Sequence, residues 1–405
     1  MTRRGDQLRE HLLWTAKDVF LELGFERASM DVVAARADSW FIAVTVAVLV
    51  SVLAMATGFG RTLANTGRAD RALVLRGGSQ SELASTLSRD NALTILDAHG
   101  VRKGAAGKPI ASAEMVAMLN LRQKNTGTKA NVALRGVGPQ GFELRPEIHI
   151  VAGRMFRPAV RELIVGRSAQ MQFEGLELGQ RLTFHDGEWT IVGVFDSGGD
   201  SHESEMMADA ETVLSAYRRN LFQSVTVQLD SAAGFDAFKD QLTTNPTLSV
   251  DVKRETGYYA EQSRGLSSII DVAGGLIGLL MGLGAVFAAL NTMYSTVASR
   301  AREIATLRAL GFGALPVVGS VLAEALLLGA AGGLIGCLAA WLGFNGVETT
   351  TLNFASFSQV SFAFRVTPAL MARGFTYAIA LAAIGGLLPA LRAARIPVVE
   401  GLRAG

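Results

Sequence analysis

Four stretches of the chain are apolar over lengths that can cross a membrane. The first, Trp40–Gly60, holds 21 residues without a charge and is bounded by Asp38 and Arg61. At a rise of about 1.5 Å per residue, this stretch is long enough for a hydrocarbon core of about 30 Å. Three more spans are predicted at about 272–293, 316–344 and 374–391. The pattern therefore predicts an α-helical membrane protein with four transmembrane helices.

The chain between the first two spans, residues 61–265, has a different pattern. Short β-rich runs alternate with polar turns, and amphipathic helical stretches lie between them. Strands are predicted at Ala72–Leu75, Asn131–Arg135, Ile148–Val151 and Glu162–Val165, a hairpin at Arg181–Phe195 turning at Asp186 and Gly187, and helices at Asp90–His99, Ala210–Arg218 and Ala233–Leu242. About 200 residues of this kind predict one inserted α+β domain.

The positive charges predict the topology. With four spans, the start of the chain, the loop after the second span and the end of the chain lie on one side. Arginines gather in all three places: Arg3, Arg4, Arg9, Arg300, Arg302, Arg308, Arg392, Arg395 and Arg403. Since cytoplasmic loops carry the excess of Lys and Arg, we expect both termini in the cytoplasm. The inserted domain and the loop Glu348–Arg365 would then face outward from an inner (plasma) membrane.

Composition agrees with a membrane protein that has one sizeable soluble part. Hydrophobic residues make up 49% of the chain, charged residues 18%, and glycine occurs 44 times. The single cysteine, Cys337, lies in a predicted span, so no disulfide framework is available. The net charge of +2 argues neither for nor against a nucleic-acid partner, and none is expected.

Residues 1–39 have apolar positions at helical spacing, with Gly24 ending one helix and Ser29 capping a second. The segment LREHLLWTAKDVFLELGFERASMDVVAARADS resembles the start of a TetR-type regulator. The first span, however, follows at the position where such a regulator has its DNA-recognition helix. We interpret the segment as a cytoplasmic leader that does not bind DNA. A gene fusion or a misplaced start codon would explain its presence. A regulatory role linked to DNA is the alternative.

The run NTMYSTVASRAREIATLRALG, Asn291–Gly311, predicts a short helix at the cytoplasmic surface that ends at Gly311. A glycine-rich span with an internal glutamate follows it, and the chain closes with LLPALRAARIPVVEGLRAG. Over residues 40–405 the chain resembles the MacB/FtsX-type ABC transporter permeases. The resemblance implies a coupling helix at 298–310, an extracytoplasmic domain of MacB-like type at 61–265, and an FtsX-like permease domain at 266–405.

The resemblance implies a permease subunit that works as a homodimer and couples ATP hydrolysis to movement of its outer domain, a mechanotransmission. The phosphate-binding pattern G-x-x-x-x-G-K-[ST] does not occur in the sequence, and Gly104–Pro109 only imitates it. We therefore expect ATP on a separate ABC ATPase subunit, and neither cofactor nor metal nor catalytic residues on this chain. Further expected partners are membrane lipids and a periplasmic adaptor. The sequence does not decide whether the substrate is a lipid, a lipoprotein, a peptide or a hydrophobic drug. Regulation of an outer partner enzyme, instead of transport, is also an open alternative.

Five residues are predicted to couple the permease to the ATPase: Arg300, Glu303, Ile304, Leu307 and Arg308. The two apolar side chains would enter a groove of the partner, while the charged side chains set the register. The alternative is an ordinary cytoplasmic loop that obeys the positive-inside rule. A sensor-regulator, or a receptor-like scaffold without an ATPase partner, is the competing function.

Glu324 is a carboxylate well inside a predicted span, where a charge costs a few kcal/mol unless it is paired or protonated. The family has a glutamate at the matching point, which favours a structural or gating role. The alternative is a carboxylate that snorkels or bonds to a neighbouring helix. Small residues at regular spacing predict helix packing at Gly274, Gly278, Gly282, Gly329 and Gly333.

One acidic cluster in the outer domain raises the question of a metal site. It contains Asp196, Asp200, His202, Glu203 and Glu205. Its spacing is not that of a metal site, so we expect a solvated acidic loop.

Overall fold

A computed structural model describes residues 30–185, 187–353 and 356–399, with only the backbone for residues 30–38. The chain divides into two compact units. Residues up to Ala56, 269–347 and from Phe364 onward form the helical unit, and residues 57–268 with 348–363 form the sheet unit. Each unit is described by itself.

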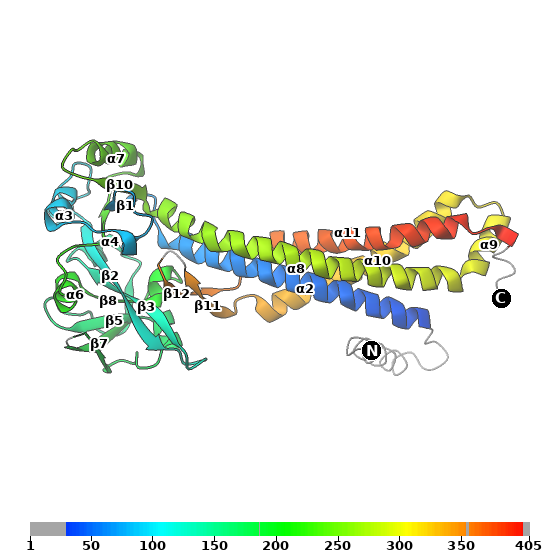
Figure 1. Ribbon diagram of the computed structural model, residues 1–405, viewed down its shortest axis with the longest axis horizontal. Helices are drawn as coiled ribbons and strands as arrows, with labels where there is room; N and C mark the ends of the chain where they lie inside the picture. Colours follow the sequence, from blue (N-terminus) through cyan, green and yellow to red (C-terminus); the bar gives the residue numbers. More distant parts are fainter. Residues whose placement is uncertain (1–29, 186, 354–355, 400–405) are drawn as a thin grey trace. The chain divides into compact units, whose positions relative to one another are not determined.

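Four helices are long and apolar enough to span a membrane: α2 (Met30–Thr66), α8 (Glu255–Ser299), α10 (Ala314–Phe344) and α11 (Pro368–Arg395). They confirm the prediction of four spanning helices (Figure 1). Helix α2 begins ten residues before Trp40, so the described end of the leader is continuous with the first span. The predicted helix end at Gly24 and cap at Ser29 lie outside the described residues.

Small residues set the spacing of the helices in the helical unit. A Cβ on Gly329 of α10 would lie 2.3 Å from the Cβ of Ala382 on α11, and one on Gly333 would lie 2.7 Å from that of Ala378. Such separations leave no room for a side chain, so only glycine permits this approach of α10 to α11.

The glycines of α8 lie against two neighbours. Cβ atoms on Gly274 and Gly278 would meet Val52 and Leu49 of α2 at 2.9 and 3.1 Å, and one on Gly282 would meet the Tyr377 hydroxyl of α11. The Tyr377 hydroxyl donates a 2.6 Å hydrogen bond to the Gly278 carbonyl. The structure therefore places all five of the predicted packing glycines at contacts between helices.

The sheet unit is built on a ten-stranded mixed sheet, in the order β10-β1-β9-β2-β3-β8-β5-β7-β4, with β6 paired to β7. The strands are β1 (Arg71–Arg76), β2 (Ala111–Arg122), β3 (Lys129–Val137), β4 (His149–Gly153), β5 (Glu162–Gly166), β6 (Arg181–Phe184), β7 (Gly187–Asp196), β8 (Glu205–Asp209), β9 (Ser224–Gln228) and β10 (Val250–Arg254). Only β3–β8 and β5–β7 pair in parallel among these strands. The α+β class expected for the inserted domain is confirmed.

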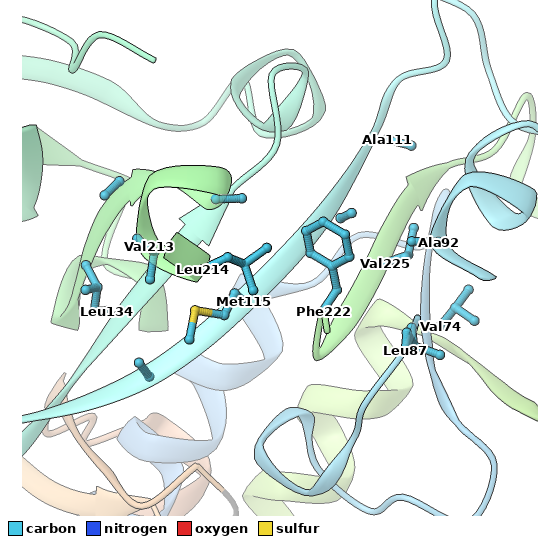
Figure 2. Packing of buried hydrophobic residues seen from close by; sticks show 14 of the residues in the cluster. Val74, Leu87, Ala92, Ala111, Met115, Leu134, Val213, Leu214, Phe222 and Val225 are labelled. Carbon is cyan, nitrogen blue, oxygen red and sulfur yellow. The ribbon is translucent and has the colours of Figure 1, made fainter. Parts of the chain in front are cut away.

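Short helices lie between these strands: η1 (Glu82–Ala84), α3 (Arg89–Leu96), α4 (Gly141–Leu144), α5 (Arg167–Gln172), η2 (Ser201–Ser204), α6 (Ala210–Ala216), η3 (Ala232–Gly234) and α7 (Phe235–Thr243). Several close the core against the sheet. In Figure 2, Met115 of β2 and Leu214 of α6 lie on one side of the Phe222 ring, with Ala92 of α3 and Val225 of β9 on the other.

The twelve-residue strand β2 was not predicted, although it lies in the middle of the sheet. Its first seven residues are all buried, and apolar and polar residues alternate only over 111–115, before the unbroken apolar run 116–119. Its Ala, Met, Leu and Glu residues are also good helix formers. The predicted hairpin is present as β6 and β7, with Phe184 opposite Gly187, while Asp186 lies outside the described residues.

The loop expected between the third and fourth spans is a strand hairpin. Strands β11 (Glu348–Asn353) and β12 (Ser358–Ala363) pair in register from Glu348 with Ala363 to Asn353 with Ser358. The Ser361 amide donates to the Ser204 hydroxyl at 2.9 Å. The Phe362 ring packs edge-on against Phe59, with 5.6 Å between centroids. Although the hairpin is distant in sequence, it belongs to the sheet unit.

The expectation of a solvated acidic loop at residues 196–205 is wrong. Asp200, His202 and Glu203 are all less than 9% exposed. The Glu205 carboxylate accepts hydrogen bonds from Arg135 at 2.7 and 3.1 Å and lies 3.2 Å from His202 Nδ1. Glu205 is buried because it meets Arg135 of β3, whereas Asp200 and Glu203 accept hydrogen bonds from nearby backbone amides and serine hydroxyls. The local sequence does not reveal the pairing with Arg135.

Arg135 is the centre of a buried ion cluster. Its guanidinium also donates to Glu82 and Glu114, each at 2.8 Å, and Arg145 shares Glu114. Burial alone would raise the pKa of Glu114, but Arg145 and Arg135 lower it to about 2. Burial would lower the pKa of His202, but Glu205 and Asp200 raise it above its ordinary value. The cluster ties η1, β2, β3 and β8 together through charge.

Candidate coupling surface

Helix α9 (Ala301–Ala309) forms most of the predicted coupling run. Arg300 precedes it, where α8 ends, and leaves the helical conformation with φ −102°. At the other end, Gly311 has φ +98°, a conformation that glycine adopts without strain. A break at Arg300 and a glycine stop at Gly311 thus separate α9 from α8 and α10 as a short helix of its own.

The inner face of α9 packs into the helical unit. Ile304 is 9% exposed and Ala305 is fully buried. Ile304 belongs to a hydrophobic cluster with Val297 of α8, Val317 of α10 and Ala393 of α11. The Ile304 side chain therefore fills the junction of three helices, and only a small part of it is exposed.

The outer face of α9 carries the other predicted apolar residue. Leu307 is 45% exposed, and Leu310, directly after the helix, is 73% exposed. The Glu303 side chain, one turn before Leu307, is 70% exposed. This face offers exposed leucines beside a carboxylate, the combination that the coupling hypothesis requires.

Arg300 links two carboxylates. Its Nε lies 3.2 Å from Glu303, and its Nη1 lies 3.2 Å from Glu324 on α10. Glu324, which was expected inside a span, is thus paired, and its side chain is 41% exposed. Pairing with an arginine from the neighbouring helix end is one way to reduce the cost of a carboxylate at this position.

Arg308 has a different role from its neighbours. Its Nη1 donates to the Ile396 carbonyl at 2.7 Å, directly after α11. Arg392, in the last turn of α11, lies over the Tyr294 ring of α8 at 5.3 Å. Arg308 is therefore partly used in holding the tail of the chain to α9.

A cavity of about 240 Å³ lies between the end of α8, α9 and the start of α10. Met293, Val297, Val317 and Val321 supply apolar walls, and Leu307 contributes to the rim. The sequence did not predict this cavity, because it forms only when three segments come together.

Three packing glycines of α11 were also not predicted from the sequence. Gly374, Gly385 and Gly386 face Val50, Ala289 and Ala325 across helix contacts. Their spacing in the last span was the available signal.

A family model described as the MacB-like periplasmic core domain matches residues 41–245, about half of the chain. A second, the FtsX-like permease C-terminal domain, matches residues 275–398 and includes α9. The chain belongs to the MacB/FtsX family of ABC transporter permeases. Neither match extends to residues 1–40, and nothing found supports the TetR resemblance of that segment.

Two curated relatives of this MacB/FtsX-type chain are named macrolide export ATP-binding/permease protein MacB. The one from Nitrobacter winogradskyi is 33% identical over 146 residues, which is 36% of this chain and 21% of the relative. The one from Bdellovibrio bacteriovorus is 21% identical over 425 aligned positions, covering 96% of this chain and 62% of the relative. The chain thus spans less than two thirds of the length of either relative.

Two solved structures align with part of this family member. The extracellular domain of the noncanonic ABC-type transporter YknZ from Gram-positive bacteria aligns with 16% identity and a TM-score of 0.35, covering 45% of this chain and 99% of that one. The periplasmic region of MacB from Actinobacillus actinomycetemcomitans aligns with 14% identity and a TM-score of 0.35, covering 47% and 91%.

Proposed function

We propose that this chain is the permease subunit of a MacB/FtsX-type ABC transporter, and that α9 couples it to a separate ABC ATPase. One observation carries the proposal: Leu307 and Leu310 are exposed next to Glu303 on a helix anchored at both ends. Exposed leucines at a short surface helix suit an apolar groove, and the nearby charges suit its rim.

The docking surface in this proposal consists of Arg302, Glu303, Leu307 and Leu310. Ile304 packs α9 against the helical unit. Arg300 pairs with Glu324, and Arg308 bonds to the Ile396 carbonyl, so both ends of α9 are anchored. A displacement of α9 would be transmitted to α10 through the Arg300–Glu324 pair, and to the chain after α11 through the bond from Arg308. The proposed mechanism is therefore mechanotransmission from ATPase closure to the spanning helices.

We propose that a separate ABC ATPase subunit hydrolyses the ATP; the 405 residues themselves do not contain the phosphate-binding pattern. The proposed assembly is a homodimer of this chain with the ATPase, both termini in the cytoplasm of an inner membrane, and the sheet unit outside. A periplasmic adaptor and membrane lipids are further proposed partners. Because the two relatives are named macrolide export proteins, macrolides are the first substrates to test among the hydrophobic drugs.

The deciding experiment is reconstitution of this chain with the ATPase encoded beside it, followed by co-purification and ATPase measurement. We expect Leu307→Asp and Glu303→Arg to release the ATPase or to uncouple its turnover. Leu93→Asp is the matched control, because Leu93 is also exposed (59%) but belongs to α3 of the sheet unit. Wild-type behaviour of both α9 variants, or failure of any ATPase to bind, would instead favour a receptor-like scaffold.

A further inference from the structure

The cavity beside α9 has apolar walls and one polar end. The walls come from Met293 and Val297 of α8 and from Val317 and Val321 of α10. At about 240 Å³, the cavity exceeds the space of about 150 Å³ that holds a benzene-sized guest in a protein interior. A short alkyl segment or one ring therefore fits between the two helices.

The polar end carries an excess of negative charge. Among the residues that line the cavity, Glu303 and Glu324 supply two carboxylates and Arg300 supplies the single guanidinium. Arg300 lies 3.2 Å from both carboxylates, so one cation is shared between two anions. A further cationic group would balance this set, whereas an anionic group would add to the repulsion.

The cavity lies at one edge of the apolar span. Arg392 is the first charged residue after the apolar stretch 374–391, and it covers Tyr294, a neighbour of the lining residue Met293. Cationic residues collect at the boundary between hydrocarbon and headgroups. An occupant from the lipid phase could therefore lay its apolar chain along the walls and keep its charged head near the carboxylates.

We propose that this cavity binds an amphiphile that carries a primary ammonium group. The ammonium pairs with Glu324 and Glu303, and the alkyl chain lies against Met293, Val297, Val317 and Val321. The source of this chemistry is an amine-headed membrane lipid or a cationic amphiphilic compound. The evidence for this binding is the shape and charge of the cavity, which shares Glu303 and Leu307 with the proposed docking surface.

The test uses the full chain in phosphatidylcholine nanodiscs and three photoreactive probes with the same dodecyl chain, ending in an amine, an alcohol or a carboxylate. Cross-linked peptides are mapped by mass spectrometry. We expect the amine to label the segments 293–297 and 317–321 about threefold more than the alcohol, the preference of a partly exposed ion pair. The carboxylate should label them least. A phosphatidylethanolamine competitor then distinguishes a lipid from a free amine as the natural source.

Matched variants separate the site from general lipid contact. Glu324→Gln and Glu303→Gln should reduce amine labelling to the level of the alcohol, and Val321→Phe should reduce labelling by all three probes. Asp271→Asn, which removes an exposed carboxylate elsewhere on α8, should change nothing. Equal labelling by the three probes would overturn the proposal. So would loss of labelling on addition of the ATPase without any headgroup preference, since a protein side chain would then be the occupant.

Discussion

The Nη1 of Arg300 lies 3.2 Å from Oε2 of Glu324, which joins the residue before α9 to a carboxylate ten residues beyond the start of α10. Both side chains are about half exposed, so the pair is screened by its surroundings. We expect an interaction free energy of about 0.5 kcal/mol from a double-mutant cycle with Arg300→Gln and Glu324→Gln in chemical unfolding. The cycle of Arg302→Gln with Glu324→Gln is the control. An equal interaction in both cycles would refute a specific pair.

Replacing Arg308 should release the tail of the chain from α9. In Arg308→Ala the Ile396 carbonyl loses its donor, and we expect faster amide hydrogen exchange in residues 393–399 and in α9. Arg308→Lys keeps the charge and should restore part of the protection. Arg302→Ala, on the exposed side of the same helix, should leave exchange in the tail unchanged. Unchanged exchange in Arg308→Ala would remove its anchoring role.

Two glycines of α10 should respond in opposite ways to the same substitution. Gly329→Ala forces a methyl group into Ala382, and we expect a loss of about 1–3 kcal/mol in the free energy of unfolding. A Cβ on Gly319 would meet no neighbouring atom within 4 Å, so Gly319→Ala should be neutral or gain up to about 1 kcal/mol from helix propensity. Unfolding in detergent measures both. Equal effects would show that α10 and α11 are not closely packed.

Breaking the ion cluster in the sheet unit should be costly. Arg135→Met leaves the carboxylates of Glu82, Glu114 and Glu205 without their shared partner, and we expect a loss of about 3–5 kcal/mol. The control is Arg181→Met, which breaks an exposed pair with Glu188 and should cost less than about 1 kcal/mol. Denaturant unfolding distinguishes the two. A small effect at Arg135 would mean that water enters the cluster.

The same cluster predicts a dependence of stability on acid. The pKa of Glu114 is about 2 in the folded protein against 4.5 as its ordinary value, so the unfolded chain binds more protons between these values. The stabilisation is present above about pH 4.5 and is lost as pH falls toward about 2. It amounts to a contribution on the order of 3 kcal/mol from this shift. In Glu114→Gln this part of the acid dependence should disappear.

His202 should act in the opposite pH range. Its pKa is raised in the folded protein, because nearby Glu205 and Asp200 outweigh its burial. Its contribution is therefore full below its ordinary pKa of about 6.5 and decreases as pH rises through the raised value. We expect unfolding measured from pH 6 to pH 9 to show this decrease in wild type and a flatter profile in His202→Asn. An identical slope in both proteins would exclude His202 as the cause.

The spans could be predicted from sequence because their signal is local. A run of 18 or more uncharged residues can be recognised without knowing its neighbours, and α2, α8, α10 and α11 each contain one. Strand β2 shows the limit. Its apolar and polar residues alternate only over 111–115 and then give way to an apolar run, so the signal for a strand is short, and its strand character comes from pairing with β3 and β9.

The candidate site could also be predicted only in part. The short helix, the glycine that ends it and its charged residues could be predicted from the run Asn291–Gly311. The directions of the side chains are not, because they depend on which helices surround α9. Ile304 and Leu307 are equally apolar in sequence, yet one fills a junction of three helices and the other is exposed. The pairing of Glu205 with Arg135, 70 positions away, could not be inferred from a local cluster of acidic residues either.

The bond from Arg308 ends on a backbone oxygen, and this has a consequence for how relatives of this chain diverge. A carbonyl group is present whatever amino acid occupies position 396, so the bond fixes the path of the tail but not the identity of that residue. A change of side chain at position 396 would leave this hydrogen bond intact, while replacement of Arg308 would remove it. Because the side chain of Ile396 also packs against the cluster around Ile304, we expect relatives that keep this tail path to exchange one apolar residue for another at 396, and substitution to be rare at 308.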